Sequence, residues 1–357
     1  MPRIRVLLVE DSLTVRKHVR ELLSQDPAIE VVGEAADGRQ ALELFEELRP
    51  DLLVLDMMLP QLTGLAVTEY VMAHRPTPIL IVSASFNRGE AFRTYDALTA
   101  GALDVLEKPR AERMDAEWER LLLSKVRLCS RIRVITHPRH RLRARSEGRA
   151  PLRAEPGAAA RLVAIGASTG GPAALVRILG ALPEDYPLPI LIVLHLAPAF
   201  ATSFAEWLDG QLPMRVGWAT HGEPIPGRGK GSVLLASPDR HLVVREGRLW
   251  HTDGPERNSC RPSIDVLFES IARECGESAV ACLLTGMGKD GAQGLAAIRR
   301  SGGMTLVQDE ATCVVFGMGG EAVRLGGADA VLPLGSIAST VVQITDRSTL
   351  LPKAGAD

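Results

Sequence analysis

Three polar residues in the second half of the chain, Ser168, His195 and Asp290, have the types that a hydrolase uses for nucleophilic catalysis. Each comes at the end of a short apolar run or in the turn after it, at residues 163–167, 189–194 and 279–284. Such runs are typical of buried parallel strands, whose carboxyl ends meet at one edge of a sheet. We therefore expect a triad in which the serine attacks an acyl carbon, the histidine carries the proton and the aspartate orients the histidine.

The segment around the serine, Gly166–Gly170, also fits the G-x-S-x-G pattern of an exposed nucleophile on a tight turn. Pro172 suits the first turn of a helix that follows. A serine between glycines is more often a plain turn or a helix cap, so this pattern alone is weak evidence. The histidine and the aspartate near neighbouring strand ends favour the catalytic interpretation.

A competing interpretation concerns the glycines around Asp290. The segment Gly286–Gly291 matches a dinucleotide-binding fingerprint, and Asp309–Glu310 follow at about the expected distance. A nicotinamide-binding domain would place the charge of Asp290 inside a loop that should cradle a pyrophosphate. The motif also comes late in its domain and leaves Ser168 and His195 without a role, so the hydrolase is the preferred interpretation.

A second group of polar residues follows apolar runs in the first part of the chain: Glu10, Asp11, Asp56, Ser83 and Lys108. Three carboxylates at one sheet edge repel each other unless a cation lies among them, and Mg²⁺ binds carboxylate and phosphate oxygens. The lysine would pair with a phosphoryl group, and the serine would hydrogen-bond to it. The alternative, carboxylates that only cap helices, does not explain all five residues.

The order of apolar segments predicts the fold class. Strand-like runs alternate with helical stripes in both halves, and a hydrophobic content of 46% with few aromatic residues suits α/β layers. A length of 357 residues favours two domains. We predict an α/β fold with two doubly wound parallel-sheet domains, joined by a linker rich in arginine and proline.

Composition argues against several other classes of protein. The net charge of −2 and the lack of a helix-turn-helix pattern after the basic linker disfavour nucleic-acid binding. The five cysteines form no C-x-x-C pair, which favours free thiols in a reducing compartment and gives no metal signature. No signal peptide and no apolar run of membrane-spanning length is present. We expect a soluble cytoplasmic protein without membrane insertion.

The first domain resembles the receiver domain of two-component response regulators, which has a flavodoxin-like fold. The resemblance implies that Asp56 is the phospho-acceptor and that Ser83 and Lys108 are switch residues. The Mg²⁺ ligands that it implies are Glu10, Asp11, Asp56 and, through its backbone carbonyl, Met58. Val105 departs from the family, because an aromatic residue usually stands three positions before the Lys108–Pro109 step. Signalling through rotation of that ring is therefore not expected.

The second domain resembles the catalytic domain of the CheB family of chemotaxis protein-glutamate methylesterases. The matching segments are Gly166–Pro172, His195, Arg261–Asp265, Leu284–Ala292, Gln308–Glu310 and Val314–Met318. The order Ser, His, Asp along the chain differs from that of α/β-hydrolases, and the implied fold is Rossmann-like. Departures from the family at Leu196, Ser237–Asp239 and Gly319 lie beside the triad and concern substrate preference.

The resemblance implies that the protein hydrolyses glutamyl 5-methyl esters on cytoplasmic helices of chemoreceptors to glutamate and methanol, and that it deamidates receptor glutamines. A histidine kinase of the CheA type would be the phosphodonor. The backbone amides of Thr169 and Met287 are the expected oxyanion-hole donors, and no metal or cofactor is expected at the hydrolase site. A signalling adaptor with an inert hydrolase domain is the non-enzymatic alternative.

These interpretations divide the chain into four predicted segments. They are a receiver domain at residues 1–128, the linker at 129–160, a methylesterase domain at 161–346 and a tail at 347–357.

Overall fold

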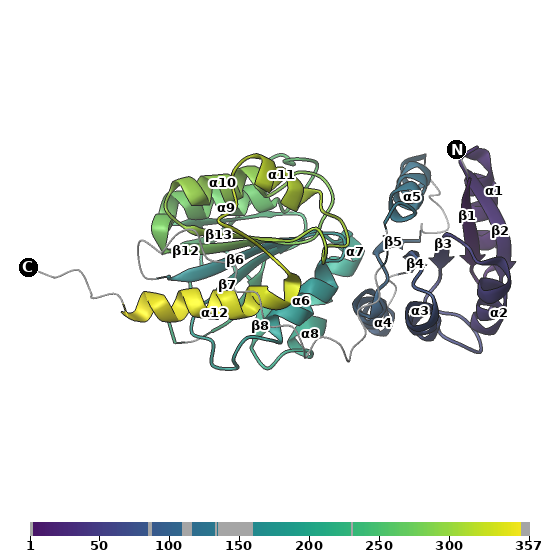
Figure 1. The fold of residues 1–357 in the computed structure, drawn as a ribbon, viewed down its shortest axis with the longest axis horizontal. Coiled ribbons are helices and arrows are strands. Elements are labelled where there is room, and N and C mark those ends of the chain that lie inside the picture. Colours follow the sequence, from purple (N-terminus) through teal and green to yellow (C-terminus); the bar gives the residue numbers. More distant parts are fainter. Residues whose placement is uncertain are drawn as a thin grey trace, which may run out of the picture. The chain divides into compact units, whose positions relative to one another are not determined.

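The computed structural model describes residues 3–84, 88–108, 116–132, 134, 160–229 and 231–350. The chain divides into two compact units, one with the elements β1 to α5 and the other with β6 to α12 (Figure 1). Each unit contains a parallel sheet, as the sequence predicts.

The first unit has a five-stranded sheet with the order β2-β1-β3-β4-β5. Its strands are β1 (Ile4–Val9), β2 (Ile29–Ala35), β3 (Leu52–Leu55), β4 (Ile79–Ser83) and β5 (Asp104–Glu107). Its helices are α1 (Leu13–Gln25), α2 (Gly38–Leu48), α3 (Gly64–His74), α4 (Arg88–Ala100) and α5 (Ala116–Cys129). The strands β3 and β4 are buried along their whole length, which explains why their sequences are continuous apolar runs and not alternating patterns.

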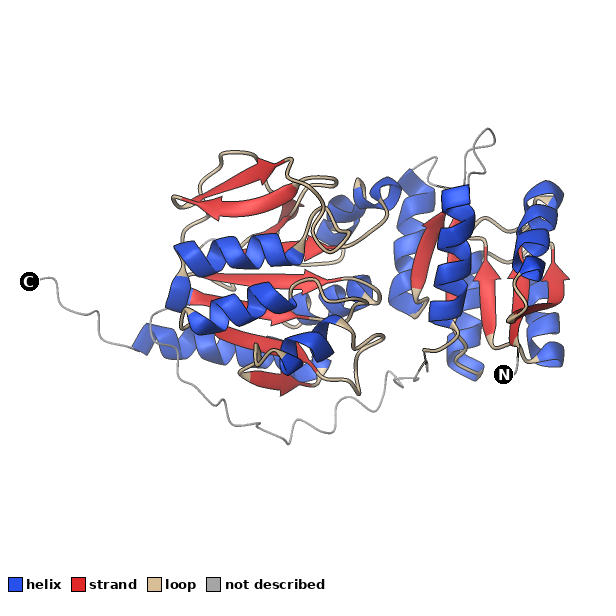
Figure 2. Ribbon diagram, turned by 90° about the horizontal axis from the view of Figure 1, so that it is seen from above, coloured by secondary structure: helices blue, strands red, loops and turns tan. Residues whose placement is uncertain are grey.

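The second unit has a seven-stranded sheet with the order β14-β13-β12-β6-β7-β9-β8. All of its strand pairs are parallel. Its strands are β6 (Leu162–Ala167), β7 (Ile190–Leu194), β8 (Val216–Trp218), β9 (Val233–Leu235), β12 (Ala279–Leu283), β13 (Met304–Gln308) and β14 (Ala330–Leu332). The antiparallel hairpin β10 (His241–Arg245) and β11 (Arg248–Thr252) lies beside this sheet (Figure 2). This hairpin was not predicted from the sequence.

Helices cover both faces of the larger sheet (Figure 1). One face carries α9 (Ile264–Glu274), α10 (Ala292–Arg300) and α11 (Met318–Arg324), and the other carries α6 (Gly171–Leu179) and α12 (Leu334–Leu350). The short elements are α7 (Pro198–Ala201), α8 (Phe204–Asp209) and the 3₁₀ turn η1 (Gly276–Ser278). Because two layers of helices cover the sheet, its central strands are buried and their polar residues gather at the strand ends.

A close contact between β6 and α9 fixes the position of the serine turn. A Cβ atom on Gly166 would lie 2.4 Å from Cγ2 of Ile264, so only glycine lets the helix pack this tightly against the strand. Ile264 is fully buried in the main hydrophobic cluster of this unit. This packing brings the N-terminus of α9 to the edge of the sheet where β6 ends.

The predicted domain boundaries stay predictions, because most of the linker and most of the tail lie outside the described residues, as does Pro109 of the predicted Lys-Pro step. The last helix, α12, continues to Leu350, beyond the predicted end of the catalytic domain at 346. Among the helices that the structure describes, none is both long and apolar enough to cross a membrane.

Candidate functional site

The predicted triad residues come from three adjacent strands of the larger sheet. Ser168 follows β6, His195 follows β7, and Asp290 lies in the loop between β12 and α10. Backbone hydrogen bonds extend the sheet past the strand ends: the amide of His195 donates to the carbonyl of Ala167 at 3.0 Å, and the amide of Ser168 donates to that of Thr285, also at 3.0 Å. The three residues therefore lie at one edge of the sheet.

Asp290 is buried and held by the N-terminus of α9. Its carboxylate accepts hydrogen bonds from the amide of Ile264 and the hydroxyl of Ser263, both at 2.7 Å, and from the side-chain amide of Asn258 at 3.1 Å. Burial alone would raise the pKa of Asp290, but His195 and these donors lower it below its usual value. The aspartate is therefore ionised at neutral pH and rigidly oriented.

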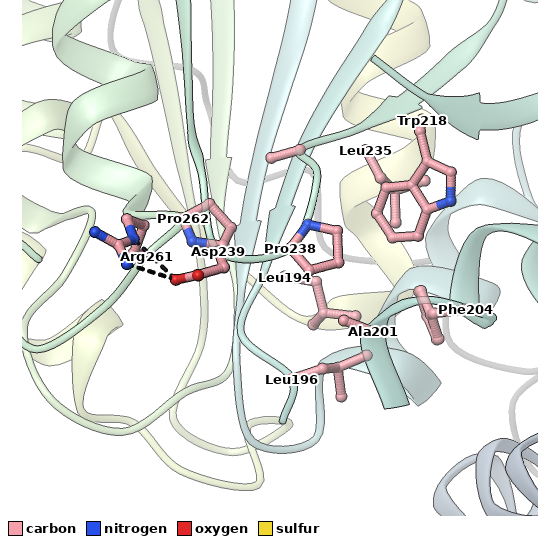
Figure 3. Close-up of a pocket in the computed structure, with 11 residues that line it drawn as sticks. Leu194, Leu196, Ala201, Phe204, Trp218, Leu235, Pro238, Asp239, Arg261 and Pro262 are labelled. Atoms are coloured by element: carbon pink, nitrogen blue, oxygen red, sulfur yellow. Dashed lines mark hydrogen bonds and ion pairs between the residues drawn. The ribbon is translucent and has the colours of Figure 1, made fainter. Parts of the chain in front are cut away.

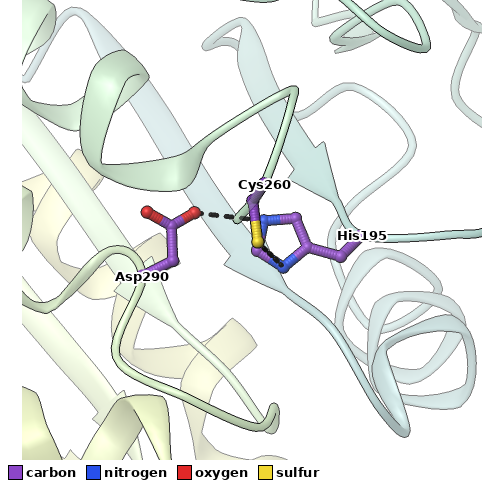
Figure 4. Close-up of side chains that lie close together, drawn as sticks. All are labelled: His195, Cys260 and Asp290. Carbon is purple, nitrogen blue, oxygen red and sulfur yellow. Dashed lines mark hydrogen bonds and ion pairs between the residues drawn. The ribbon is translucent and has the colours of Figure 1, made fainter. Parts of the chain in front are cut away.

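His195 contacts both Asp290 and Cys260, as Figure 4 shows. Its Nε2 atom is 3.1 Å from an oxygen of Asp290, although this nitrogen has no partner with hydrogen-bond geometry among the described residues. Its Nδ1 atom is 3.7 Å from the sulfur of Cys260. Burial lowers the pKa of His195, but Asp290 and Cys260 outweigh that effect and raise it to about 9.

The two ring nitrogens of His195 have different neighbours. Nε2 faces the aspartate, and Nδ1 faces the sulfur of Cys260. Within the described residues the Ser168 hydroxyl makes no hydrogen bond to His195, so the contact between nucleophile and base stays a prediction. Such contacts often tighten only when substrate is bound.

The loop after β12 approaches Ser168 closely. A Cβ atom on Gly286 would lie 2.7 Å from Cβ of Ser168 and 2.3 Å from the end of the Met318 side chain. No described residue accepts a hydrogen bond from the backbone amide of Thr169 or of Met287. Free amides beside the serine are what an oxyanion hole requires, which supports the predicted role of these two residues without testing it.

The first unit brings the second group of predicted residues together. The carboxylates of Glu10, Asp11 and Asp56 lie within 4.8 Å of one another. The ammonium group of Lys108 lies 2.8 Å from one oxygen of Glu10 and 2.8 Å from one oxygen of Asp56. Burial and the neighbouring Asp56 raise the pKa of Glu10 to about 7, although Lys108 opposes them. The cluster thus carries more negative charge than one lysine neutralises.

The donor set of this cluster suits a small hard cation. Carboxylate oxygens are the ligands that Mg²⁺ prefers, and three carboxylates converge here within 4.8 Å of one another. Met58 lies beside Asp56, and its amide donates to an oxygen of that carboxylate at 3.3 Å. The residues present therefore fit Mg²⁺ in the predicted position.

Ser83 makes a contact that the sequence analysis did not predict. Its hydroxyl is buried and donates to the carboxylate of Glu90 on α4 at 3.1 Å, and not to Asp56. Burial raises the pKa of Glu90. Val105 is buried in β5. In this structure the predicted switch serine is thus connected to α4.

Three residues that contact the predicted triad, Cys260, Ser263 and Asn258, were given no role from the sequence. Cys260 contacts His195, and no sequence pattern marks it as a neighbour of the histidine. Ser263 caps α9 and also holds Asp290. A serine directly before the apolar face of a helix is an N-cap signal, so Ser263 could have been found from that pattern.

Comparisons with known proteins give two family matches. The CheB methylesterase family matches residues 163–341, and the response regulator receiver domain matches residues 6–117. A protein-glutamate methylesterase/protein-glutamine glutaminase 2 of Anaeromyxobacter dehalogenans is 43% identical over 342 residues, which cover 96% of this chain and 97% of that protein. A protein-glutamate methylesterase/protein-glutamine glutaminase of Nitrosospira multiformis is 42% identical, with 96% and 97% covered. The crystal structure of the Thermotoga maritima CheB methylesterase catalytic domain covers 52% of this chain and 99% of its own, at 35% identity and a TM-score of 0.49.

Proposed function

Since the chain belongs to the CheB methylesterase family, we propose that it is a phosphorylation-regulated protein-glutamate methylesterase and protein-glutamine glutaminase. The substrates would be glutamyl 5-methyl esters and glutamines on cytoplasmic helices of chemoreceptors, and the protein would act in the cytoplasm. The observation that supports this proposal is that Ser168, His195 and Asp290 follow three adjacent strands, with Nε2 of His195 3.1 Å from an oxygen of Asp290.

In the proposed reaction the Ser168 oxygen attacks the acyl carbon of the ester while His195 takes the hydroxyl proton. The amides of Thr169 and Met287 would donate to the oxyanion, each contributing roughly 3 kcal/mol. The tetrahedral intermediate collapses, and His195 returns the proton to the leaving methoxide, which departs as methanol. Water then adds to the acyl-serine by the same route and releases glutamate.

The deamidation follows the same path with a glutamine side chain. The acyl-serine is the same, but the leaving group is ammonia instead of methanol. Asp290 would hold the histidine in the orientation that both steps need, and its carboxylate lies 3.1 Å from Nε2 of the ring.

For the first unit we propose phosphorylation of Asp56 by a histidine kinase of the CheA type. Glu10, Asp11, Asp56 and the carbonyl of Met58 would hold Mg²⁺, which would neutralise phosphoryl charge. Lys108 is already within 2.8 Å of the acceptor carboxylate and would pair with the phosphoryl oxygens. Ser83 would exchange its hydrogen bond to Glu90 for one to the phosphoryl group, which couples phosphorylation to α4.

The direct test measures methanol released from methylated receptor membranes, with and without a small phosphodonor. The proposal expects release by the parental protein, stimulation by the phosphodonor, and no stimulation of Asp56→Asn. A protein that binds the membranes but releases no methanol under any of these conditions would be the signalling adaptor instead.

A further inference from the structure

A tight turn at residues 257–260 lies between β11 and α9 in the second unit. Two backbone hydrogen bonds close it: the amide of Arg257 donates to the carbonyl of Cys260 at 3.1 Å, and the amide of Cys260 donates to the carbonyl of Arg257 at 3.0 Å. The two central residues, Asn258 and Ser259, have φ angles of 53° and 60°. This left-handed region is uncommon for residues other than glycine, and asparagine adopts it more readily than most. The turn therefore restricts the residue types that suit position 258.

Ion pairs restrain the turn on both sides. Arg257 donates to the carboxylate of Glu269 on α9, from Nη1 at 2.7 Å and from Nη2 at 2.6 Å. Arg261, directly after the turn, donates to one oxygen of Asp239 from Nε at 2.9 Å and from Nη2 at 2.7 Å (Figure 3). Such charge-assisted hydrogen bonds connect the turn to α9 and to the segment between β9 and β10.

The side-chain amide of Asn258 bridges two buried carboxylates. Its nitrogen donates to Asp265 at 2.9 Å and to Asp290 at 3.1 Å. Asp265 is fully buried, and Asp290 is nearly so. An NH₂ group has two hydrogens, so it can donate to both carboxylates at once. Two neighbouring carboxylates repel each other when both are ionised, and a shared donor offsets part of that repulsion.

The charged groups around Asp290 come from three segments. His195 follows β7, Asp265 is on α9, and Arg257 is in the turn. Burial raises the pKa of Asp265, and the charge of Asp290 adds to that rise. The pKa of Asp290 nevertheless lies below its usual value, and Asn258 is one of the hydrogen-bond donors that lower it.

We propose that Asn258 is a positioning residue of the hydrolase site, which keeps Asp290 ionised and oriented toward His195 although Asp265 lies beside it. The inference rests on the proposed function, because that function gives Asp290 and His195 their roles in ester hydrolysis. Position 258 requires both a left-handed backbone and an NH₂ donor. Aspartate adopts this backbone but cannot donate when it is ionised, and glycine adopts it but has no side chain. Asparagine meets both requirements.

The first test removes the donor and keeps the turn. Asn258 is exposed, so Asn258→Gly opens no cavity in the core, and glycine retains the left-handed backbone. The kcat/KM for 4-nitrophenyl acetate at neutral pH should fall about tenfold, the loss expected for one hydrogen bond to a charged group. Ser259→Gly is the matched control, because it makes a similar change at the exposed neighbour in the same turn, and it should stay within about twofold of the parental value. Far-UV circular dichroism verifies that each variant is folded.

The second test asks whether Asn258 acts through Asp290. In an Asp290→Ala background, the further change Asn258→Gly should alter kcat/KM less than about twofold, because the carboxylate that it positions is no longer present. A residue that only stabilises the turn would reduce activity by the same factor in both backgrounds.

The third test uses pH. Asn258→Asp keeps the size and the backbone of asparagine but replaces the NH₂ group with a carboxyl group. When protonated, this group is neutral and has one hydrogen to donate; when ionised, it donates none and repels Asp290. The kcat/KM of Asn258→Asp relative to the parental protein should therefore fall about threefold or more between pH 5 and pH 8. Ser259→Asp adds the same charge at the exposed neighbour, and its relative kcat/KM should stay constant.

The outcomes separate the role of Asn258 from the proposed function. The positioning role is refuted if Asn258→Gly keeps the parental kcat/KM, if its effect is equally large in the Asp290→Ala background, or if the relative kcat/KM of Asn258→Asp does not change with pH. An unfolded Asn258→Gly protein would also refute it, since Asn258 would then be needed for the fold. If the parental protein hydrolyses neither the small ester nor methylated receptors, the proposed function itself fails.

Discussion

Removal of the Cys260 thiol should change the pH dependence of ester hydrolysis. The sulfur lies 3.7 Å from Nδ1 of His195, and together with Asp290 it raises the pKa of the histidine to about 9. A histidine with this pKa is protonated at neutral pH, and only about one molecule in a hundred has the neutral base at pH 7. The rate should therefore rise with pH and level off near pH 9.

In Cys260→Ala the protonated imidazole of His195 loses the thiol, one of the two neighbouring groups that raise its pKa; Asp290 is the other. The midpoint of the pH–rate profile should move to lower pH, and the rate at pH 7 should rise about tenfold if the midpoint falls by about one pH unit. The assay is kcat/KM for 4-nitrophenyl acetate from pH 6 to pH 10. Cys275→Ala is the matched control, because it removes a partly buried thiol away from His195 and should leave the midpoint unchanged.

Two results would refute this reasoning. A midpoint that does not move in Cys260→Ala would show that the thiol has no electrostatic influence on the base. A parental profile that is flat between pH 7 and pH 10 would show that His195 does not titrate in this range.

Three further predictions concern groups that the structure places around the two sites. Asp290→Asn should lower kcat about 10³–10⁴-fold, because a neutral amide cannot stabilise the imidazolium of His195. It should also lower Tm, because the NH₂ group of the asparagine faces the hydrogen-bond donors at the N-terminus of α9. A loss of activity below tenfold would contradict the role of Asp290. Because the pKa of His195 is raised in the folded protein, protonation of His195 should stabilise the fold by at most about 3 kcal/mol below pH 6.5, and this stabilisation should disappear as the pH rises to 9. The difference in unfolding free energy between the parental protein and His195→Gln should therefore shrink over this pH range. A constant difference would contradict the prediction. Asp56→Asn or a chelator of Mg²⁺ should abolish acid-labile phosphorylation by a small donor, and labelling at the parental rate would show that another residue is phosphorylated.

The strand ends could be predicted from the sequence because each functional residue follows a continuous apolar run. Buried parallel strands have this pattern, and their carboxyl ends share an edge, so the sequence predicts that Ser168, His195 and Asp290 lie at one edge of the sheet. The same reasoning placed Asp56 near Lys108. The two sheets and the α/β class are confirmed by the structure.

The contacts between distant loops could not be predicted in this way. Cys260 lies in the segment before α9 and contacts His195, and no periodic pattern in the sequence predicts that contact. Glu90 faces Ser83 because α4 packs beside β4, which is a tertiary contact. The hairpin β10–β11 was missed because its short strands mix polar and apolar residues without a clear period.

The most direct test of the central claim asks whether Ser168 is the nucleophile. Parental protein and Ser168→Ala are compared for methanol release from methylated receptor membranes, and far-UV circular dichroism verifies that both are folded. The serine is only partly buried at a turn, so its replacement should leave the fold intact and lower the rate by more than about a thousandfold. A folded Ser168→Ala protein that keeps more than about a hundredth of the parental rate would contradict the serine hydrolase mechanism.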